Sequence, residues 1–384
     1  MYTTYLNNEL IIGSYDKGRS SSILDTNAGL NVQNSVIDIK DESYDGTFDI
    51  FIIHGYQIFE HQGLNPNFNI NFKSKIKCKT LIIDLMGEYR SDPTILKEFD
   101  DFIDEHIECN DIKVVGVYED TDIVRYKNWK FFKHKCSWSF FINPHNNTFH
   151  KWDSAEIPTV ICGSKWREKT KTHLFQCLNN TMRPHRIFMV NEILKRSIKS
   201  DFILSSREGE YDGEKSPKIL IDDVVESKIE NIKKDRFGIQ TQFSDKCYID
   251  VVTETMYDGQ FITEKAVKPF YSLQIPIIFG YKGIIKYFED LGFDMFRDII
   301  NHKYDEMDDV KKKAKYIADE LHRLSLIEDF HSIYIDSKER LLSNQHLLNY
   351  YNFSSNRHKE LAKFMFGDSF SSLKCDENYN TLYL

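Results

Sequence analysis

The sequence lacks the cysteine spacing that marks a disulfide framework or a zinc ribbon. Its seven cysteines are scattered, and none forms a C-x-x-C pair. The N-terminus has no charged segment followed by an apolar core, and no apolar run approaches ~18 residues. We therefore expect neither a leader peptide nor a membrane span, and we expect a cytoplasmic protein.

Basic residues are also in short supply. The chain has 50 Lys and Arg against 59 Asp and Glu, which gives a formal net charge of −9. Broad attachment to nucleic acid or to an anionic membrane needs clustered cations, so both partners are disfavoured. A local basic pocket for one small anion is still compatible with this net charge.

Apolar residues are plentiful: 41% of the 384 residues are hydrophobic and 14% are aromatic. The chain is longer than the roughly 250–300 residues at which a single core stops growing. We therefore expect two domains, with a boundary near residues 158–166, and a helical extension that ends in a tail. The expected divisions are residues 1–160, 161–325 and 326–384.

The first part alternates β-branched runs with a helical pattern. Strands are predicted at residues 48–54, 79–85 and 112–118, and a helix is predicted at 93–107, where apolar residues recur with a helical period. Alternating strands and helices imply parallel strands joined by crossover helices. The sequence therefore predicts an α/β layer.

The second part repeats this alternation. Strands are predicted at residues 173–178, 201–205, 248–253 and 275–279. Helices are predicted at residues 183–199, from Thr263, and at 284–291, 308–324 and 337–351. Residues 206–246 are polar and without a clear period, so we expect an irregular or inserted segment there.

The helix predicted at 183–199 begins with an unusual cluster of cations. Asn180 or Thr181 can cap it, and Pro184 suits its first turn, where no N–H is needed. The same turn carries three basic residues, Arg183, His185 and Arg186. Each cation opposes the helix dipole by roughly 0.3–1 kcal/mol, so a bound anion would explain the cluster. The alternative is that the arginines are solvated or pair with acids elsewhere.

A second helix start carries a related pattern. Thr263 can cap the helix, and Glu264 takes the favoured acidic position in its first turn. Lys265 and Lys268 share one helix face, and we expect Pro269 to end the helix. The carboxylate can bind a ribose diol and the lysine can bind a diphosphate. The alternative is a capped surface helix with incidental charges.

The pairing of Arg-Pro-His-Arg at 183–186 with Thr-Glu-Lys-x-x-Lys-Pro at 263–269 resembles GT-B glycosyltransferases. The nearest are fucosyltransferase-like enzymes of the type found in phages and large viruses, and the similarity spans roughly residues 174–324. It implies two Rossmann-like domains that face a central cleft, with a helical C-terminal extension. It also implies a GDP- or UDP-sugar donor, no metal, inversion at the anomeric carbon, and a glycan or other hydroxyl acceptor. The setting would be the host cytoplasm.

The resemblance assigns roles to individual residues of the second part. Arg186 matches the phosphate-binding arginine, Glu264 the ribose-binding acid and Lys265 the diphosphate-binding lysine. Glu254 occupies the position of a polar residue that contacts the donor. Residues 266–267 depart from the family, so sugar selectivity is not carried over. The expected donor set is Arg183, Arg186, Glu254, Thr263, Glu264, Lys265 and Lys268.

The first part has no recognisable match, so the catalytic base is argued from position alone. In doubly wound sheets, site residues lie beyond the carboxyl ends of strands. His54, Asp84 and Glu88 lie at such ends. We choose Glu88 and His54 as the candidates. The alternatives are that His54 caps its strand and that Asp84 binds backbone N–H groups.

Other interpretations remain open. Asp120-Thr121-Asp122 follows a predicted strand, as in the metal site of GT-A glycosyltransferases, but we favour a solvated turn and predict no metal site. The aromatic segment 129–141 can stack on sugars or form part of a core. Alternative functions are a phage-type transferase that glycosylates a hydroxylated DNA base, and a non-catalytic nucleotide- or glycan-binding protein.

Overall fold

The computed structural model describes residues 4–5, 12–14, 30–31, 36–38, 47–54, 59–60, 63–64, 75–84, 93–117, 129–133, 166–219, 241–257, 262–353, 361 and 363–365. The chain divides into two compact units. One comprises Met1–Asn146 with Ser354–Leu384, and the other comprises Asn147–Phe353. The chain thus leaves the first unit, builds the second and returns. Of the boundary expected at 158–166, only Trp166 is described.

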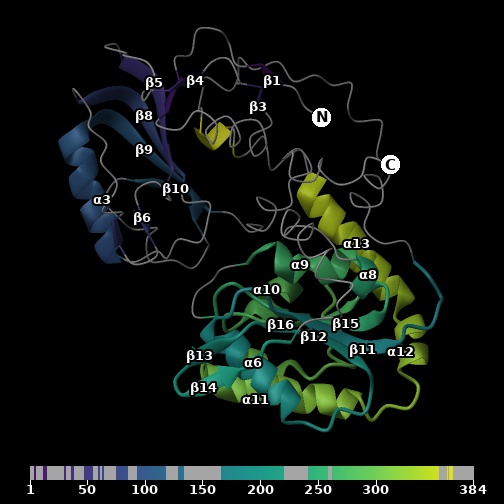
Figure 1. The fold of residues 1–384 in the computed structure, drawn as a ribbon. Helices are drawn as coiled ribbons and strands as arrows, with labels where there is room; N and C mark the ends of the chain where they lie inside the picture. Colours follow the sequence, from purple (N-terminus) through teal and green to yellow (C-terminus); the bar gives the residue numbers. More distant parts are fainter. Residues whose placement is uncertain are drawn as a thin grey trace. The chain divides into compact units, whose positions relative to one another are not determined.

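The first unit is built on a six-stranded parallel sheet (Figure 1). Its strands are β2 (Ile12–Ser14), β4 (Val36–Asp38), β5 (Thr47–His54), β8 (Ile76–Asp84), β9 (Ile107–Val117) and β10 (Lys130–Lys133). Their spatial order is β10-β9-β8-β5-β2-β4. Helix α3 (Pro93–His106) connects β8 to β9. The predicted strands and helix of this part are therefore confirmed to within a few residues.

Two small strand pairs complete the described part of this unit. Strand β1 (Thr4–Tyr5) pairs in parallel with β3 (Leu30–Asn31), and β6 (Phe59–Glu60) pairs antiparallel with β7 (Gly63–Leu64). The core runs through the apolar centres of β5 and β8, where Phe51, Ile52, Leu81 and Ile82 are fully buried. Burial on both faces is what near-continuous apolar strands of a parallel sheet require.

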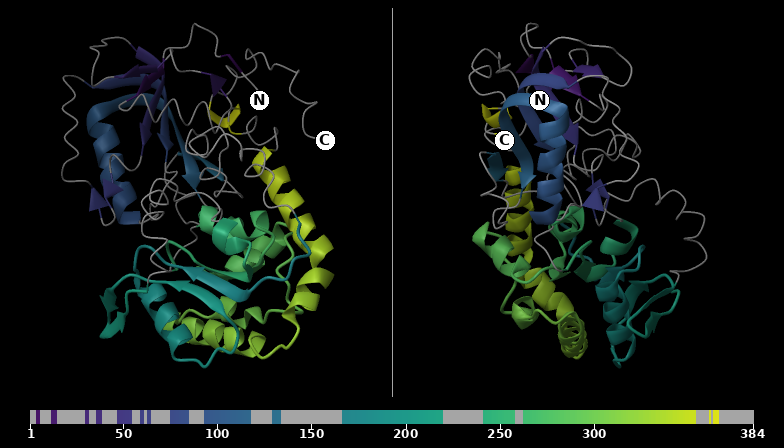
Figure 2. Two further views of the ribbon diagram at one scale, coloured as in Figure 1. Left: turned by 45° about the vertical axis from the view of Figure 1, so that its right-hand side comes forward. Right: turned by 90° about the vertical axis from the view of Figure 1, so that its left-hand side faces the viewer.

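The second unit holds a four-stranded parallel sheet in the order β12-β11-β15-β16. The strands are β11 (His173–Leu178), β12 (Phe202–Ser205), β15 (Cys247–Thr253) and β16 (Ile275–Phe279). The helices are α6 (Pro184–Leu194), α8 (Thr241–Ser244), α9 (Glu264–Tyr271), α10 (Ile284–Asp290), α11 (Val310–Leu324), α12 (Phe330–Asp336) and α13 (Lys338–Phe353), with a 3-10 turn η4 (His302–Glu306). Helices α6 and α11 cover one face of the sheet, and α9 and α10 lie on the other (Figures 1 and 2).

The strand order of each unit defines a switch point. In the second unit the chain passes from β11 to one neighbour, β12, and then returns to the other neighbour, β15. In the first unit it passes from β2 to β4 and then to β5 on the other side. Both units combine parallel strands with helices, which confirms the predicted α/β class. Ligands of such sheets bind beyond the carboxyl ends of the strands that flank the switch.

Helix α6 is shorter than predicted: it ends at Leu194, and residues 195–199 are not helical. The reason is tertiary. Past the helix end, the N–H of Lys199 donates to Ser325 Oγ at 3.2 Å, and Ser200 Oγ donates to the carbonyl of Ser325 at 3.3 Å. These bonds to the end of α11 replace the hydrogen bonds that a longer helix would make.

The expectation that Pro269 ends its helix is also wrong. Helix α9 contains Pro269 and continues to Tyr271. The last turn is stabilised by burial, because the Phe270 ring stacks on Phe293 with centroids 4.5 Å apart. Packing of this aromatic pair offsets the hydrogen bond that proline cannot make.

Residues 206–246 are partly regular rather than irregular throughout. Strands β13 (Gly209–Tyr211) and β14 (Glu214–Ser216) form an antiparallel hairpin. Its turn residues Asp212 and Gly213 have φ of 51° and 75°. An Asp-Gly pair favours this two-residue turn, so a signal for the hairpin was present in the sequence. The hairpin is fixed to α6 by Asn191, whose Nδ2 donates to Glu214 Oε2 at 2.8 Å.

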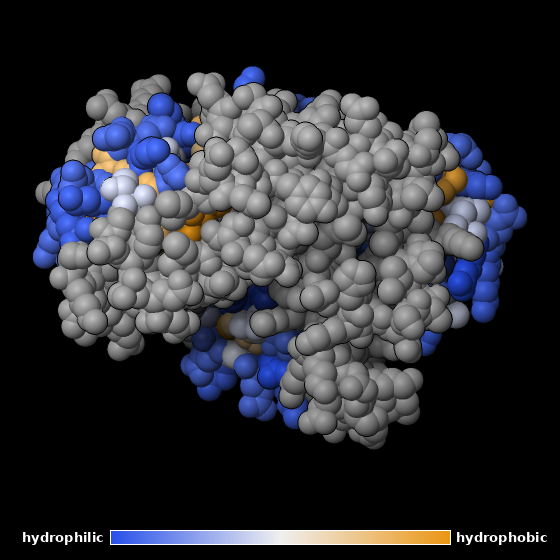
Figure 3. Space-filling model, turned by 90° about the horizontal axis from the view of Figure 1, so that it is seen from above, coloured by the Kyte–Doolittle hydropathy of each residue, from blue (hydrophilic) through white to orange (hydrophobic). Residues whose placement is uncertain are grey.

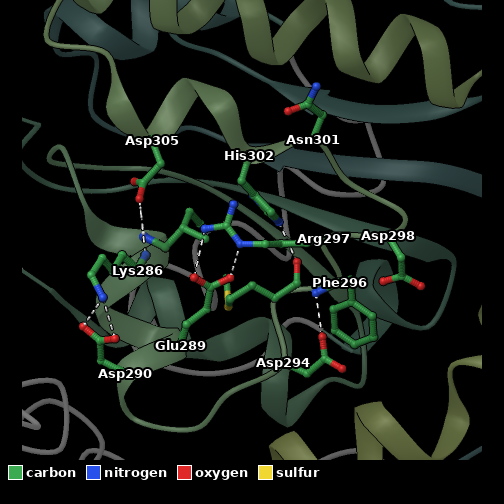
Figure 4. A network of polar contacts seen from close by, with 12 residues as sticks. Lys286, Glu289, Asp290, Asp294, Phe296, Arg297, Asp298, Asn301, His302 and Asp305 are labelled. Atoms are coloured by element: carbon green, nitrogen blue, oxygen red, sulfur yellow. Dashed lines mark hydrogen bonds and ion pairs between the residues drawn. The ribbon is translucent and has the colours of Figure 1, made fainter.

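The segment after β16 is held by a polar network (Figure 4). The carboxylate of Asp305 points at the start of α10 and accepts N–H bonds from Ile285 and Lys286 at 3.2 and 3.3 Å. Arg340 of α13 bonds both Asp294 and Asp298, and its guanidinium lies 4.5 Å from the centre of the Phe296 ring. These contacts fix the loops that follow β16.

On the face drawn in Figure 3, described residues are mostly hydrophilic and apolar side chains show only in small patches. Within the part of the chain that the structure describes, no helix is long and apolar enough to cross a membrane. The cysteines of that part, Cys78, Cys109, Cys177 and Cys247, are free thiols.

Candidate functional site at the carboxyl edge of the second sheet

The topology brings the two predicted helix starts to one place. Strands β11 and β15 are neighbours in register, with Gln176 paired to Asp250. Helix α6 follows β11 and helix α9 follows β15, so both begin at the carboxyl edge beside the switch point. The strand ends are tied by Thr253, whose Oγ1 donates to Asn179 Oδ1 at 2.6 Å. The position of the candidate site therefore follows from strand order.

The start of α6 is built differently from the prediction. Arg183, not Asn180 or Thr181, is the N-cap residue, with φ −131° and ψ 162°, and it makes no side-chain cap bond. Pro184 takes the first helical position, as predicted. Because proline fixes φ and lacks an N–H, the residue before it becomes the extended N-cap.

His185 is a buried, neutral side chain at this helix start. It has 0% exposure, and burial lowers its pKa to about 3, with the nearby Arg186 adding to the effect. Its Nε2 lies 2.7 Å from the carbonyl oxygen of Glu254, so Nε2 carries the proton and donates it. His185 thus links α6 to the end of β15.

The guanidinium of Arg186 is occupied by backbone carbonyls. Nη1 donates to the oxygen of Thr181 at 2.7 Å, and Nη2 donates to the oxygens of Thr253 and Glu254 at 3.1 and 3.0 Å. The residue is 5% exposed. Arg186 therefore joins the loop after β11 to the loop after β15.

The start of α9 is organised by Glu254. Its carboxylate accepts bonds from the N–H of Thr263 at 2.9 Å, the hydroxyl of Thr263 at 2.8 Å and the N–H of Thr255 at 2.9 Å. Thr263 is the N-cap, and its Oγ1 accepts the N–H of Lys265 at 3.3 Å. The predicted cap at Thr263 is confirmed.

Lys265 is the most accessible cation of this helix start. Its Nζ donates to the hydroxyls of Thr255 and Thr263 at 3.1 and 3.3 Å and pairs with Glu264 at 3.2 Å. The Lys265 side chain is 35% exposed, whereas that of Glu264 is 4% exposed. Burial lowers the pKa of Lys268, and the charge of Glu264 opposes this shift. The arrangement places a partly exposed lysine side chain beside a buried carboxylate.

A pocket of about 400 Å³ lies beside the start of α6. It lies between the loop after β11 and the β13 hairpin, and it is lined by Asn180, Thr181, Met182, Arg183, Pro184, Ile187, Arg207, Glu208, Gly209, Glu210 and Tyr211. Gly209 is needed there, because a Cβ atom would lie 2.8 Å from Met182 Cβ. The lining carries two arginines and two glutamates, so its formal side-chain charges cancel, and the N-terminus of α6 is the feature that suits an anion.

The structure links five of the seven predicted donor residues by hydrogen bonds or ion pairs: Arg186, Glu254, Thr263, Glu264 and Lys265. Arg183 lines the pocket, and Lys268 lies one turn along α9. The sequence reasoning missed Arg207 and Thr255. Thr255 directly follows Glu254 at a strand end, a position that offered a usable signal, whereas Arg207 lies in a segment without a readable period.

The predicted catalytic candidates belong to the first unit. His54 ends β5 and is paired in register with Asp84 at the end of β8, so both lie at the carboxyl edge of that sheet. His54 also follows the strand that flanks the switch point of that unit. Glu88 and residues 120–122 lie outside the described residues. Within the described ranges, no group of three or more His, Cys, Asp or Glu is placed to hold a metal ion.

The two parallel sheets define an α/β protein, and the second sheet carries a polar site at its switch point. The sequence matches no family profile and no curated protein. Among solved structures, it is similar to a crystal structure of alpha1,3-fucosyltransferase, with a TM-score of 0.40, 8% identity, and coverage of 94% of this chain and 91% of that one. A complex of alpha1,3-fucosyltransferase with GDP-fucose gives a TM-score of 0.36, 8% identity, and coverage of 88% and 90%. A similarity of this size says nothing of the chain's activity.

Proposed function

We propose that this protein is a glycosyltransferase that moves a sugar from a nucleoside-diphosphate sugar to a hydroxyl acceptor. The observation that carries the proposal is the meeting of two helix starts, those of α6 and α9, at Glu254 beside the switch point. Helix N-termini with nearby cations bind anions, and sugar transfer requires a site that stabilises a departing diphosphate.

The roles of the donor residues follow from their accessibility. The Lys265 side chain is 35% exposed and Arg183 lines the pocket beside α6, so we assign both to the diphosphate. Glu264 is the candidate that binds the ribose hydroxyls. Its carboxylate is buried beside Lys265, so the ribose must approach it past the Lys265 side chain. Arg186 does not contact the donor in this assignment. It supports the site through its hydrogen bonds to the backbone carbonyls of Thr181, Thr253 and Glu254. The donor is a GDP- or UDP-sugar.

The acceptor side is assigned to the first unit. We propose that Glu88 or His54 removes the proton of the attacking hydroxyl, because each follows a parallel strand at its carboxyl end. The transfer is proposed to be inverting and independent of metal, with a glycan as acceptor. A transferase acting on a hydroxylated DNA base is less favoured, because the net charge of −9 opposes DNA binding.

A thermal-shift screen tests the donor assignment. Inorganic pyrophosphate, UDP, GDP, CMP and dTDP are each added to the full chain, and we expect one nucleoside diphosphate to stabilise it. A ligand at 100 times its Kd adds about 2.7 kcal/mol of stability. Lys265→Ala should weaken binding about tenfold or more. The matched control is Lys286→Ala, which removes an exposed lysine paired with Asp290 on α10 and should bind as the wild type does.

Turnover then separates an enzyme from a binding protein. Release of the nucleoside diphosphate from the matching sugar nucleotide, with or without acceptor, would establish transfer or hydrolysis. Nucleotide binding without any turnover would support the non-catalytic alternative. Loss of turnover on addition of EDTA would point to a metal site, with Asp120 and Asp122 as the first residues to substitute. If no nucleotide stabilises the chain, the donor assignment is wrong.

A further inference from the structure

Glu254 contacts both helix starts of the candidate site with different parts of the same residue. Its backbone carbonyl accepts bonds from His185 Nε2 and Arg186 Nη2, which belong to the start of α6. Its carboxylate accepts the N–H and hydroxyl of Thr263, which caps α9. A single residue at the end of β15 therefore bridges α6 and α9.

The carboxylate of Glu254 is fully enclosed. The residue has 0% exposure, and Oε1 and Oε2 together accept three hydrogen bonds from Thr255 and Thr263. A carboxylate accepts without donating, so it matches three donors, whereas an amide would turn an NH₂ group toward one of them. The sequence resemblance implied that Glu254 contacts the sugar-nucleotide donor. In the structure its carboxylate is instead bonded to Thr255 and Thr263 of the protein.

The backbone around Glu254 is fixed as firmly as the side chain. Its N–H donates to the carbonyl oxygen of Phe279 at 2.9 Å, which extends the pairing of β15 with β16 by one residue. Gly280 follows, and a Cβ atom there would lie 3.5 Å from Glu254 Cγ. The bond to Phe279 thus anchors the backbone of Glu254 to the neighbouring strand.

We infer that Glu254 is a positioning residue that sets the relative placement of the α6 and α9 starts. Through these helix starts it sets the relative positions of Lys265 and of Arg183, which lines the pocket. This inference rests on the proposed function for its effect on ligand binding. Glu254 does not touch the ligand. It acts through the Thr263 hydroxyl, which also accepts a bond from the Lys265 ammonium group at 3.3 Å.

The first test measures pyrophosphate binding by calorimetry on the full chain. Glu254→Gln should weaken binding roughly tenfold or more, because it leaves a buried donor unmatched beneath Lys265. On a Lys265→Ala background the same change should have less than ~2-fold further effect, because the two residues act in one network. The control is Glu320→Gln, another buried carboxylate, which accepts the N–H of Asn301 at 2.8 Å and should lower Tm without changing the affinity.

The second test is hydrogen exchange without ligand. The amides of Thr255, Thr263 and Lys265 should exchange faster in Glu254→Gln than in the wild type. Should that variant fail to fold, Thr263→Val replaces the hydroxyl by a methyl group and should show the same faster exchange. Thr263→Ser keeps the hydroxyl and should behave as the wild type does. If wild-type protein binds no pyrophosphate, the proposed function fails. The exchange rates then still show whether Glu254 holds the start of α9 in place. The inference is overturned if Glu254→Gln changes neither the amide exchange rates nor the affinity for pyrophosphate. It is also overturned if Glu320→Gln loses as much affinity as Glu254→Gln does.

Discussion

Replacing Arg186 by lysine separates two roles that a buried arginine at a helix start can have: binding a phosphate group and holding backbone carbonyl groups in place. In the structure its guanidinium donates to three carbonyl oxygens, that of Thr181 in the loop after β11 and those of Thr253 and Glu254 at the end of β15. A lysine ammonium is a single point on a flexible chain and does not reproduce a planar fork. We therefore expect Arg186→Lys to lose at least one and at most two of these bonds.

The size of the effect follows from the number of bonds lost. Hydrogen bonds to charged groups contribute roughly 1.5–3 kcal/mol each, and Arg186 is 5% exposed, so solvent does not replace them. We expect the free energy of unfolding of the second unit to fall by about 1.5–6 kcal/mol. Urea unfolding measures this loss. The matched control is Arg207→Lys, an exposed arginine on the pocket wall, which should change stability by less than ~0.5 kcal/mol.

One result would refute this reasoning. If Arg186→Lys unfolds at the same urea concentration as the wild type but no longer binds the nucleotide, the guanidinium serves the ligand and not the backbone carbonyls. A fall in stability that accompanies a modest loss of affinity supports the structural role. The measurement thus decides between the phosphate contact implied by sequence resemblance and the backbone contacts seen in the structure.

The remaining predictions concern acid stability and the pocket. Burial lowers the pKa of His302 to about 4, so the folded protein keeps it neutral while the unfolded chain protonates near pH 6.5. The contribution of His302 to stability should fall by on the order of 3 kcal/mol as pH drops from about 6.5 toward 4, so urea unfolding of His302→Gln should show a fall that is smaller by about that amount. Gly209→Ala should cost about 1–3 kcal/mol in the same assay, since its Cβ would lie 2.8 Å from Met182 Cβ; wild-type stability would contradict the tight packing.

Much of the secondary structure was predictable because its causes are local. Strands β11 and β16 occupy the predicted residues, since continuous apolar runs identify strands buried on both faces. Proline at the first position of α6 and Thr263 before α9 mark helix starts by φ and by a side-chain cap, both of which act within a few residues. The Asp212–Gly213 turn carried an equally local signal that the sequence reasoning did not use.

The tertiary structure alone decided what the site residues contact. Arg186 and Glu254 are 68 positions apart, and nothing in either neighbourhood indicates that a guanidinium and a carbonyl will meet. Their meeting depends on β15 lying beside β11, which follows from the strand order and not from local preference. Burial has the same origin: Glu264 and Lys265 are adjacent in sequence, yet one side chain is 4% and the other 35% exposed. The sequence by itself determined the alternating elements and the charged helix starts. Strand order and packing determined which charges face solvent, because hydrogen-bond partners and desolvation come from segments distant along the chain.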